Sequence, residues 1–202
     1  QGDRIMIDKM VGKTEVALYG LAYSIGMLVQ LFISGMNSAL TPWMYSKIKK
    51  GDIRSMRKVL QLLSVVVVGI AVALMLISPE LVLIFGSPKY REAVYVIPPV
   101  AASVFFIFIY NILSMPQFYY EKTQFLMAAS MAAAGANVVL NFIFIRLFGY
   151  IAAGYTTLAC YMLYSVGHYI VSKRILVNEG IQENLMSPGF LVACSAFLIG
   201  AS

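Results

Sequence analysis

The stretch that decides the fold is VLQLLSVVVVGIAVALMLISP, residues 59 to 79, because it contains no charged residue. As a helix it would be about 31 Å long, close to the roughly 30 Å hydrocarbon core of a bilayer. Further uncharged runs lie at 16–46, 93–120, 123–145 and 147–172. Each run exceeds the roughly 18 residues that mark a membrane-spanning helix. The sequence therefore predicts an all-α protein, a polytopic transmembrane helical bundle.

Composition supports this class. Of the 202 residues, 60% are hydrophobic and 12% are charged, whereas soluble domains carry about 25% charged residues. The apolar runs lack the alternation of polar and apolar residues over about ten positions that is typical of a membrane β-barrel strand. We expect membrane lipids around this chain and no nucleic-acid partner.

The two ends of the chain both look cut. The start, QGDRIMIDKM, carries charges at once and has none of the regions of a signal peptide. The end, GFLVACSAFLIGAS, stops inside a fresh apolar run. We predict one helical bundle over residues 1–202, with about six spans plus a truncated final helix, as a fragment of a longer chain.

Loop charges predict the orientation of the bundle. One set of loops, 47–58, 121–124 and 172–184, carries nine Lys and Arg residues, and the opposite set carries six. Because Lys and Arg are enriched in cytoplasmic loops, residues 47–58 are predicted to be cytoplasmic and residues 80–92 to lie outside.

Three polar side chains interrupt the apolar stretch NVVLNFIFIRLFGYIAAGYTTL, residues 137–158. Asn137 and Asn141 are four residues apart and project from one helical face, where lipid cannot satisfy their amides. They either join two helices or line a wet cavity. Arg146 either lies at a helix end, with its head in water, or turns toward an internal aqueous cavity.

The remaining reactive residue types indicate no metal, cofactor or catalytic site. Cys160 and Cys194 lie in apolar segments and are expected to be small buried hydrophobic residues. His168 has no acid near it in the sequence, so packing is favoured over a proton relay. We therefore expect a protein that is not an enzyme.

Several short blocks together resemble the second half of a bacterial polysaccharide flippase of the O-antigen, or Wzx, type. This type belongs to the oligosaccharide/polysaccharide exporter branch of the multidrug/oligosaccharidyl-lipid/polysaccharide (MOP) superfamily, whose fold is MATE-like. The resemblance covers about residues 3 to 175 and depends on the order and spacing of the blocks. They are Asp3-Arg4, Gly12 with Tyr19, Tyr90 and Ala93 with Pro98, Lys122-Thr123, Asn137 with Asn141, and Gly149-Tyr150 with Ala152-Ala153.

The resemblance implies a two-lobe transporter of the bacterial inner membrane, of which this chain is the second lobe. Such a protein flips an undecaprenyl pyrophosphate-type lipid-linked oligosaccharide by alternating access, and other polysaccharide-assembly proteins are possible partners. Basic residues facing the cavity would hold the pyrophosphate. On this reading Arg4 lies at the cavity rim, and Arg4 and Asp8, one helical turn apart, either pair with each other at the surface or contribute to the rim. The candidate cavity residues are thus Arg4, Asp8, Asn137, Asn141 and Arg146.

Two alternatives stay open. A cation-coupled multidrug antiporter of the same superfamily would share the architecture, but it would favour a central acid, and the five complete spans contain none. A membrane glycan-processing enzyme would need paired acids or a long outer loop. The outer loop at 80–92 is short, and its Glu80 and Glu92 are twelve residues apart.

Overall fold

The structure is a computed structural model that describes residues 2–202, and it is built from helices joined by short turns. In chain order these are α1 (Gly2–Met10), α2 (Lys13–Lys49), α3 (Ile53–Leu76), α4 (Ser78–Phe85), the 3-10 helix η1 (Pro88–Tyr95), α5 (Ile97–Tyr119), α6 (Gln124–Phe148), α7 (Ala152–Asn178) and α8 (Pro188–Ala201). No strand occurs between residues 2 and 202, so the predicted all-α bundle is confirmed.

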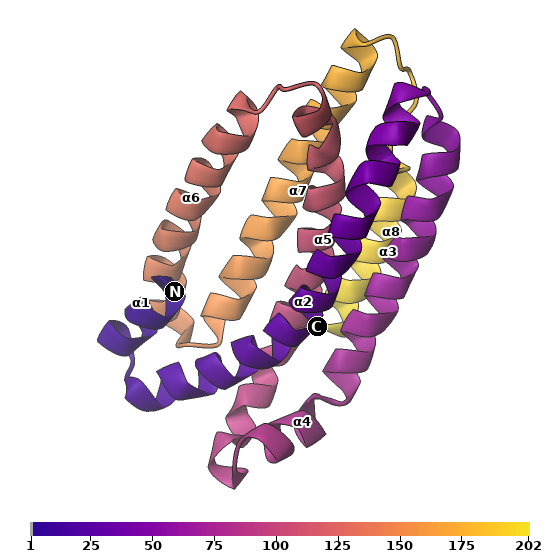
Figure 1. Cartoon of the computed structure of the whole chain (residues 1–202). Coiled ribbons are helices and arrows are strands. Elements are labelled where there is room, and N and C mark those ends of the chain that lie inside the picture. The colour runs from indigo at the N-terminus through magenta and orange to yellow at the C-terminus, as the bar shows by residue number, and fades with distance from the viewer. Residues whose placement is uncertain (1) are drawn as a thin grey trace.

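The long helices run side by side, and their connections alternate between the two ends of the bundle (Figure 1). The turns at 50–52 and 120–123 and the segment 179–187 lie at one end. The α1–α2 turn, α4 and the α6–α7 turn lie at the other. This arrangement places the two sets of loops that differ in charge at opposite ends.

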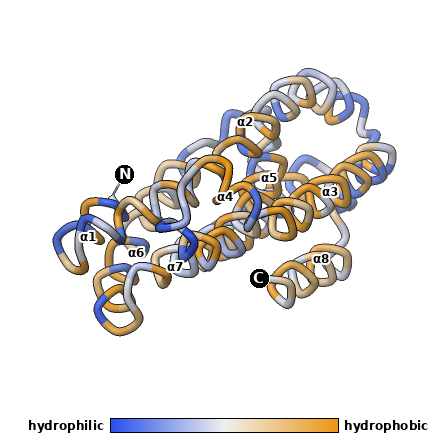
Figure 2. The backbone as a smooth tube through the Cα atoms, turned by 90° about the horizontal axis from the view of Figure 1, so that it is seen from below, coloured by the Kyte–Doolittle hydropathy of each residue, from blue (hydrophilic) through white to orange (hydrophobic). Residues whose placement is uncertain are grey.

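Four helices are long and apolar enough to cross a membrane: α2, α3, α5 and α6. Helix α7 has 27 residues, but tyrosines, threonines and a histidine lower its hydropathy. The hydrophobic residues run along helices such as α3, and the hydrophilic ones gather toward turns (Figure 2). The predicted run at 147–172 begins too early: α6 continues to Phe148, and the turn at Gly149 (φ 75°) separates it from α7.

Helix α5 forms the centre of the bundle. In its most apolar stretch 83% of the residues are buried, against 11% in that of α6. Phe105, Phe108 and Ile112 on α5 are fully buried among α2, α3 and α7. Glycine permits close packing here, since a Cβ at Gly154 of α7 would lie 2.9 Å from the ring of Pro99. Helix α6 therefore lies at the periphery of the bundle, against α7 and α1.

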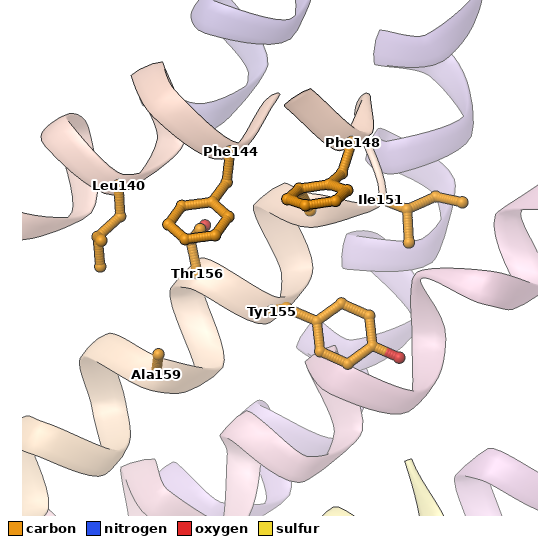
Figure 3. A pocket seen from close by; sticks show the side chains of 8 residues that line it. Leu140, Phe144, Phe148, Ile151, Tyr155, Thr156 and Ala159 are labelled. Carbon is orange, nitrogen blue, oxygen red and sulfur yellow. The ribbon is translucent and has the colours of Figure 1, made fainter. Parts of the chain in front are cut away.

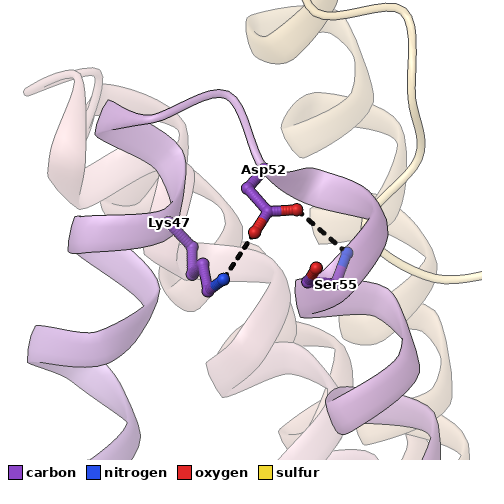
Figure 4. Close-up of polar contacts among 3 residues, drawn as sticks. All are labelled: Lys47, Asp52 and Ser55. Atoms are coloured by element: carbon purple, nitrogen blue, oxygen red, sulfur yellow. Dashed lines mark hydrogen bonds and ion pairs between the residues drawn. The ribbon is translucent and has the colours of Figure 1, made fainter.

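The turn between α2 and α3 is fixed by a side-chain cap. The Asp52 carboxylate accepts a hydrogen bond from the Ser55 amide at 3.3 Å and another from Lys47 Nζ (Figure 4). An acid at this position satisfies an N–H group of the first helical turn that has no partner within the helix. Both interactions hold the pKa of the Asp52 carboxyl below its ordinary value of 3.8.

Candidate functional site

A carboxylate inside the bundle organises a polar cluster at the start of α1. Asp3 Oδ1 accepts a hydrogen bond from Asn141 Nδ2 at 2.6 Å, and Asp3 Oδ2 accepts one from the Tyr19 hydroxyl at 3.0 Å. The Thr157 hydroxyl lies 3.4 Å from the same oxygen. Asp3 is half-buried, and such hydrogen bonds offset the cost of removing its carboxylate from water. The cluster therefore joins α1, α2, α6 and α7 through one carboxylate.

The two asparagines of α6 take part in this cluster together. Asn141 Nδ2 donates to Asn137 Oδ1 at 3.0 Å, and Asn137 Nδ2 donates to the Thr157 hydroxyl at 3.3 Å. The Thr156 hydroxyl donates to Asn141 Oδ1. Asn141 is fully buried, whereas Asn137 is partly exposed. Asn141 thus bridges helices, and Asn137 both bridges helices and lines a cavity.

That cavity, of about 460 Å³, lies between α6 and the helices α1, α2, α5 and α7. Its lining residues are Gly2, Asp3, Tyr23, Tyr110, Ser130, Ala133, Ala134, Asn137, Val138, Thr157, Cys160, Tyr161 and Tyr164. Alanines on α6 leave room for it.

Aromatic rings form one wall of this cavity. The Tyr110 and Tyr161 rings stack with centroids 6.1 Å apart and an angle of 3°, and the Tyr164 ring lies 4.8 Å from that of Tyr110. Asp3 is the one charged group among the described lining residues, and none of them is basic. The cavity therefore presents flat rings, hydroxyls, an amide and one acid.

Arg4 and Asp8 are not among the residues that line this cavity, and they form no ion pair with each other in residues 2–202. Arg4 Nη2 donates to the Gly20 carbonyl at 3.4 Å, and its guanidinium lies 5.8 Å from the centre of the Tyr23 ring. Asp8 is exposed, beside a shallow surface hollow that Arg4 also lines. Within residues 2–202 the ion pairs are Lys47–Asp52, Arg57–Glu183 and Lys122–Glu179. The Arg4–Asp8 pair, one of the two alternatives for these residues, is absent from this set, because the arginine turns toward α2 while Asp8 is exposed.

Arg146 lies in the last turn of α6, where it is exposed, and its guanidinium lies 4.4 Å from the centre of the Phe142 ring. A cation at this position is favourable to the helix dipole. The structure therefore shows the helix-end position and not the internal cavity for this residue.

A second hollow, of about 490 Å³, lies between α6 and α7 toward their connecting turn (Figure 3). Leu140, Phe144, Phe148 and Tyr155 are among its lining residues, and no charged residue is among the described residues that line it. Apart from the Tyr155 and Thr156 hydroxyls its lining is apolar, so this surface suits a polar solute poorly. The tyrosine-lined cavity beside Asp3 is therefore the candidate functional site.

Sequence reasoning missed Asp3 and Thr157 as members of the site. Asp3 entered that reasoning only as a member of the Asp3-Arg4 block, because it lies outside the long apolar runs. Within residues 2–202 no group of three or more His, Cys, Asp or Glu side chains is placed to hold a metal ion.

An all-helical bundle with long apolar helices and a partly polar cavity beside α6 is typical of a polytopic membrane protein. The chain belongs to the MatE family, whose model matches residues 3–143 and whose members are transporters. It is also 32% identical over 132 residues to an uncharacterized membrane protein of Haemophilus influenzae. That alignment covers 61% of this chain and 31% of the relative, so the chain spans about a third of that protein. No solved structure matches the chain.

Proposed function

We propose that this chain is the second lobe of a transporter that flips a lipid-linked oligosaccharide of the undecaprenyl pyrophosphate type across the bacterial inner membrane. Membership of the MatE family supports a transporter. The observation that carries the substrate class is the wall of tyrosines beside Asn137 and Thr157. A tyrosine ring packs on the apolar face of a sugar while its hydroxyl and the neighbouring amide bond the sugar hydroxyls.

The mechanism follows from the cost of moving a glycan through lipid. Its hydroxyls would have no partners in about 30 Å of hydrocarbon, and each unsatisfied polar group costs several kcal/mol. A polar cavity that opens alternately to each side supplies those partners, and the isoprenoid tail stays in the bilayer.

The pyrophosphate needs a cation, and the described residues that line the cavity include none. Arg4 is the nearest candidate, because its guanidinium lies against Tyr23, which lines the cavity. Its bond to the Gly20 carbonyl is long, at 3.4 Å, so exchanging it for a phosphate oxygen costs little.

A cation-coupled multidrug antiporter is the second candidate, and one observation favours it. The five complete spans contain no central acid, but α1 brings the Asp3 carboxylate to the cavity wall. An acid at that place suits a cationic drug or a coupled cation better than it suits a neutral sugar.

The test compares Tyr110→Ala with Tyr155→Ala in the full-length transporter. Tyr110 lines the cavity, whereas Tyr155 is exposed in the apolar hollow. Loss of one stacking ring is expected to slow flipping of the lipid-linked oligosaccharide about tenfold, with Tyr155→Ala unchanged and both proteins equally abundant. Drug extrusion that falls in Tyr110→Ala while glycan flipping stays at the wild-type rate would support the antiporter instead.

A further inference from the structure

Phe125, at the start of α6, packs against α7 at Gly167. The Phe125 ring lies 3.3 Å from the position that a Cβ would take at Gly167. Its centroid lies 5.5 Å from that of the His168 ring, edge to face at 79°. The absence of a side chain at Gly167 therefore lets Phe125 approach α7 closely.

This contact lies next to the candidate cavity, on the side of the 120–123 turn. His168 packs edge to face on Tyr164, with centroids 4.4 Å apart, and Tyr164 lines the cavity. The Tyr164 and Ser130 hydroxyls are hydrogen-bonded at 2.7 Å, which joins α7 to α6. Phe125 and His168 thus form the layer between the cavity and this end of the bundle.

The first half of α6 has few other attachments. The buried residues of α6 are Asn141 and Ile145, both in its second half. The second half is also held by the turn at Gly149 and by the Asp3 cluster. The helix is therefore anchored through its second half, and its other end is held against α7 by Phe125, by Ser130 and by the Lys122–Glu179 ion pair of the preceding turn.

The layer beneath Phe125 contains polar atoms that lack partners. Gln117 Nε2 and His168 Nδ1 lie 2.7 Å apart, but His168 Nε2 and Gln117 Oε1 have no hydrogen-bond partner, and both side chains are fully buried. Ser172 Oγ, one turn further along α7, is also buried without a hydrogen-bond partner. Water would satisfy these atoms if Phe125 moved away, which offsets the packing lost on opening.

We propose that Phe125, Gly167, His168 and Gln117 form a latch that closes the cavity on the side of the 120–123 turn. With Phe125 on Gly167 the cavity is shut from that side. When Phe125 leaves, the first half of α6 swings out about its anchored end, and water reaches His168 and then the cavity. The role in transport rests on the proposed function, but the latch itself is measured without any substrate.

Cys160 lines the cavity and reports its accessibility. The test uses a protein whose only cysteine is Cys160, which requires Cys194→Ala. A membrane-impermeant maleimide is applied from one face of the membrane, the face from which a separate Ser55→Cys variant is labelled. Phe125→Ala is expected to raise the rate of Cys160 alkylation about tenfold, because it removes the aromatic contact that favours the closed state. Met127→Ala is the matched control, since Met127 is on the same helix and is 67% exposed.

A second variant is expected to act in the opposite direction. The double substitution Gln117→Leu with His168→Phe removes the polar atoms that water would satisfy, so it favours the closed latch and lowers the alkylation rate below that of the wild type. If Phe125→Ala does not accumulate, Gly167→Ala replaces it, because the added methyl group displaces the ring without removing it.

Unchanged alkylation in both Phe125→Ala and Gly167→Ala would overturn the latch, as would an equal rise in Met127→Ala. A protein that shows the expected labelling but flips no glycan retains the latch and loses the proposed function. A protein that flips glycan but lacks the labelling pattern retains the proposed function and loses the latch.

Discussion

Asn141→Leu is the substitution that tests the polar cluster most directly. It removes hydrogen bonds to Asp3 on α1 and to Thr156 on α7, and a third to Asn137 on the same helix, α6. Side-chain hydrogen bonds between membrane helices contribute about 0.6 kcal/mol each on average, so the two bonds to Asp3 and Thr156 together amount to about 1 kcal/mol. Leucine also leaves Asp3 with fewer donors, which adds to the cost.

The free energy of unfolding in bicelles, measured by titration with a denaturing detergent, is the assay. Asn111→Leu is the matched control, because the Asn111 amide bonds to the Ile107 carbonyl of its own helix at 2.9 Å and joins no second helix. We expect Asn141→Leu to lose at least about 1 kcal/mol and Asn111→Leu less than half of that. Equal losses in the two variants would refute the role of Asn141 as a bridge between helices.

An exchange of the two partners sharpens the test. Asn141→Asp alone places two carboxylates at a hydrogen-bond distance, where both cannot be ionised without mutual repulsion. Adding Asp3→Asn restores one acid and one amide. The double variant is expected to recover most of the stability that Asn141→Asp loses, and recovery of none of it would show that the pair does not interact.

The orientation predicts that an impermeant thiol reagent labels Ser87→Cys in intact spheroplasts and does not label Ser55→Cys; the reverse pattern would invert the topology. Acid is expected to release the cap of α3. Because Lys47 and the Ser55 amide lower the pKa of Asp52, their stabilisation is present above the ordinary value of 3.8 and is lost as the pH falls through the lowered pKa. Amide exchange of residues 53–56, corrected for intrinsic rates, should accelerate below that pH, and Asp52→Ala should remove the effect.

The spans could be predicted because each depends on its own residues. The uncharged run at 59–79 becomes most of α3 together with the start of α4, and the run at 123–145 becomes most of α6. A helix in lipid satisfies its backbone internally, so hydropathy over a single segment decides whether it forms. The ends of the helices were predicted less accurately. Helix α6 ends at Phe148 because of the backbone conformation at Gly149, and not at the charged Arg146.

The helical face of Asn137 and Asn141 could also be read from their spacing, since residues four apart project together. The hydrogen-bond partners of these two asparagines could not be predicted from the sequence. Arg4 and Asp8 have the right spacing for a pair, yet Arg4 turns to the Gly20 carbonyl, because packing of α1 on α2 decides its direction.

The sequence by itself determined that this chain is a helical membrane protein, because the transfer of each apolar segment into lipid is a local free energy. Only the tertiary structure decided that Asp3 meets Asn141, 138 residues away, and that tyrosines from α2, α5 and α7 share one cavity. Those contacts depend on how the helices pack against each other. Hydropathy carries no information about that packing, since lipid and protein interior are equally apolar surroundings for a helix.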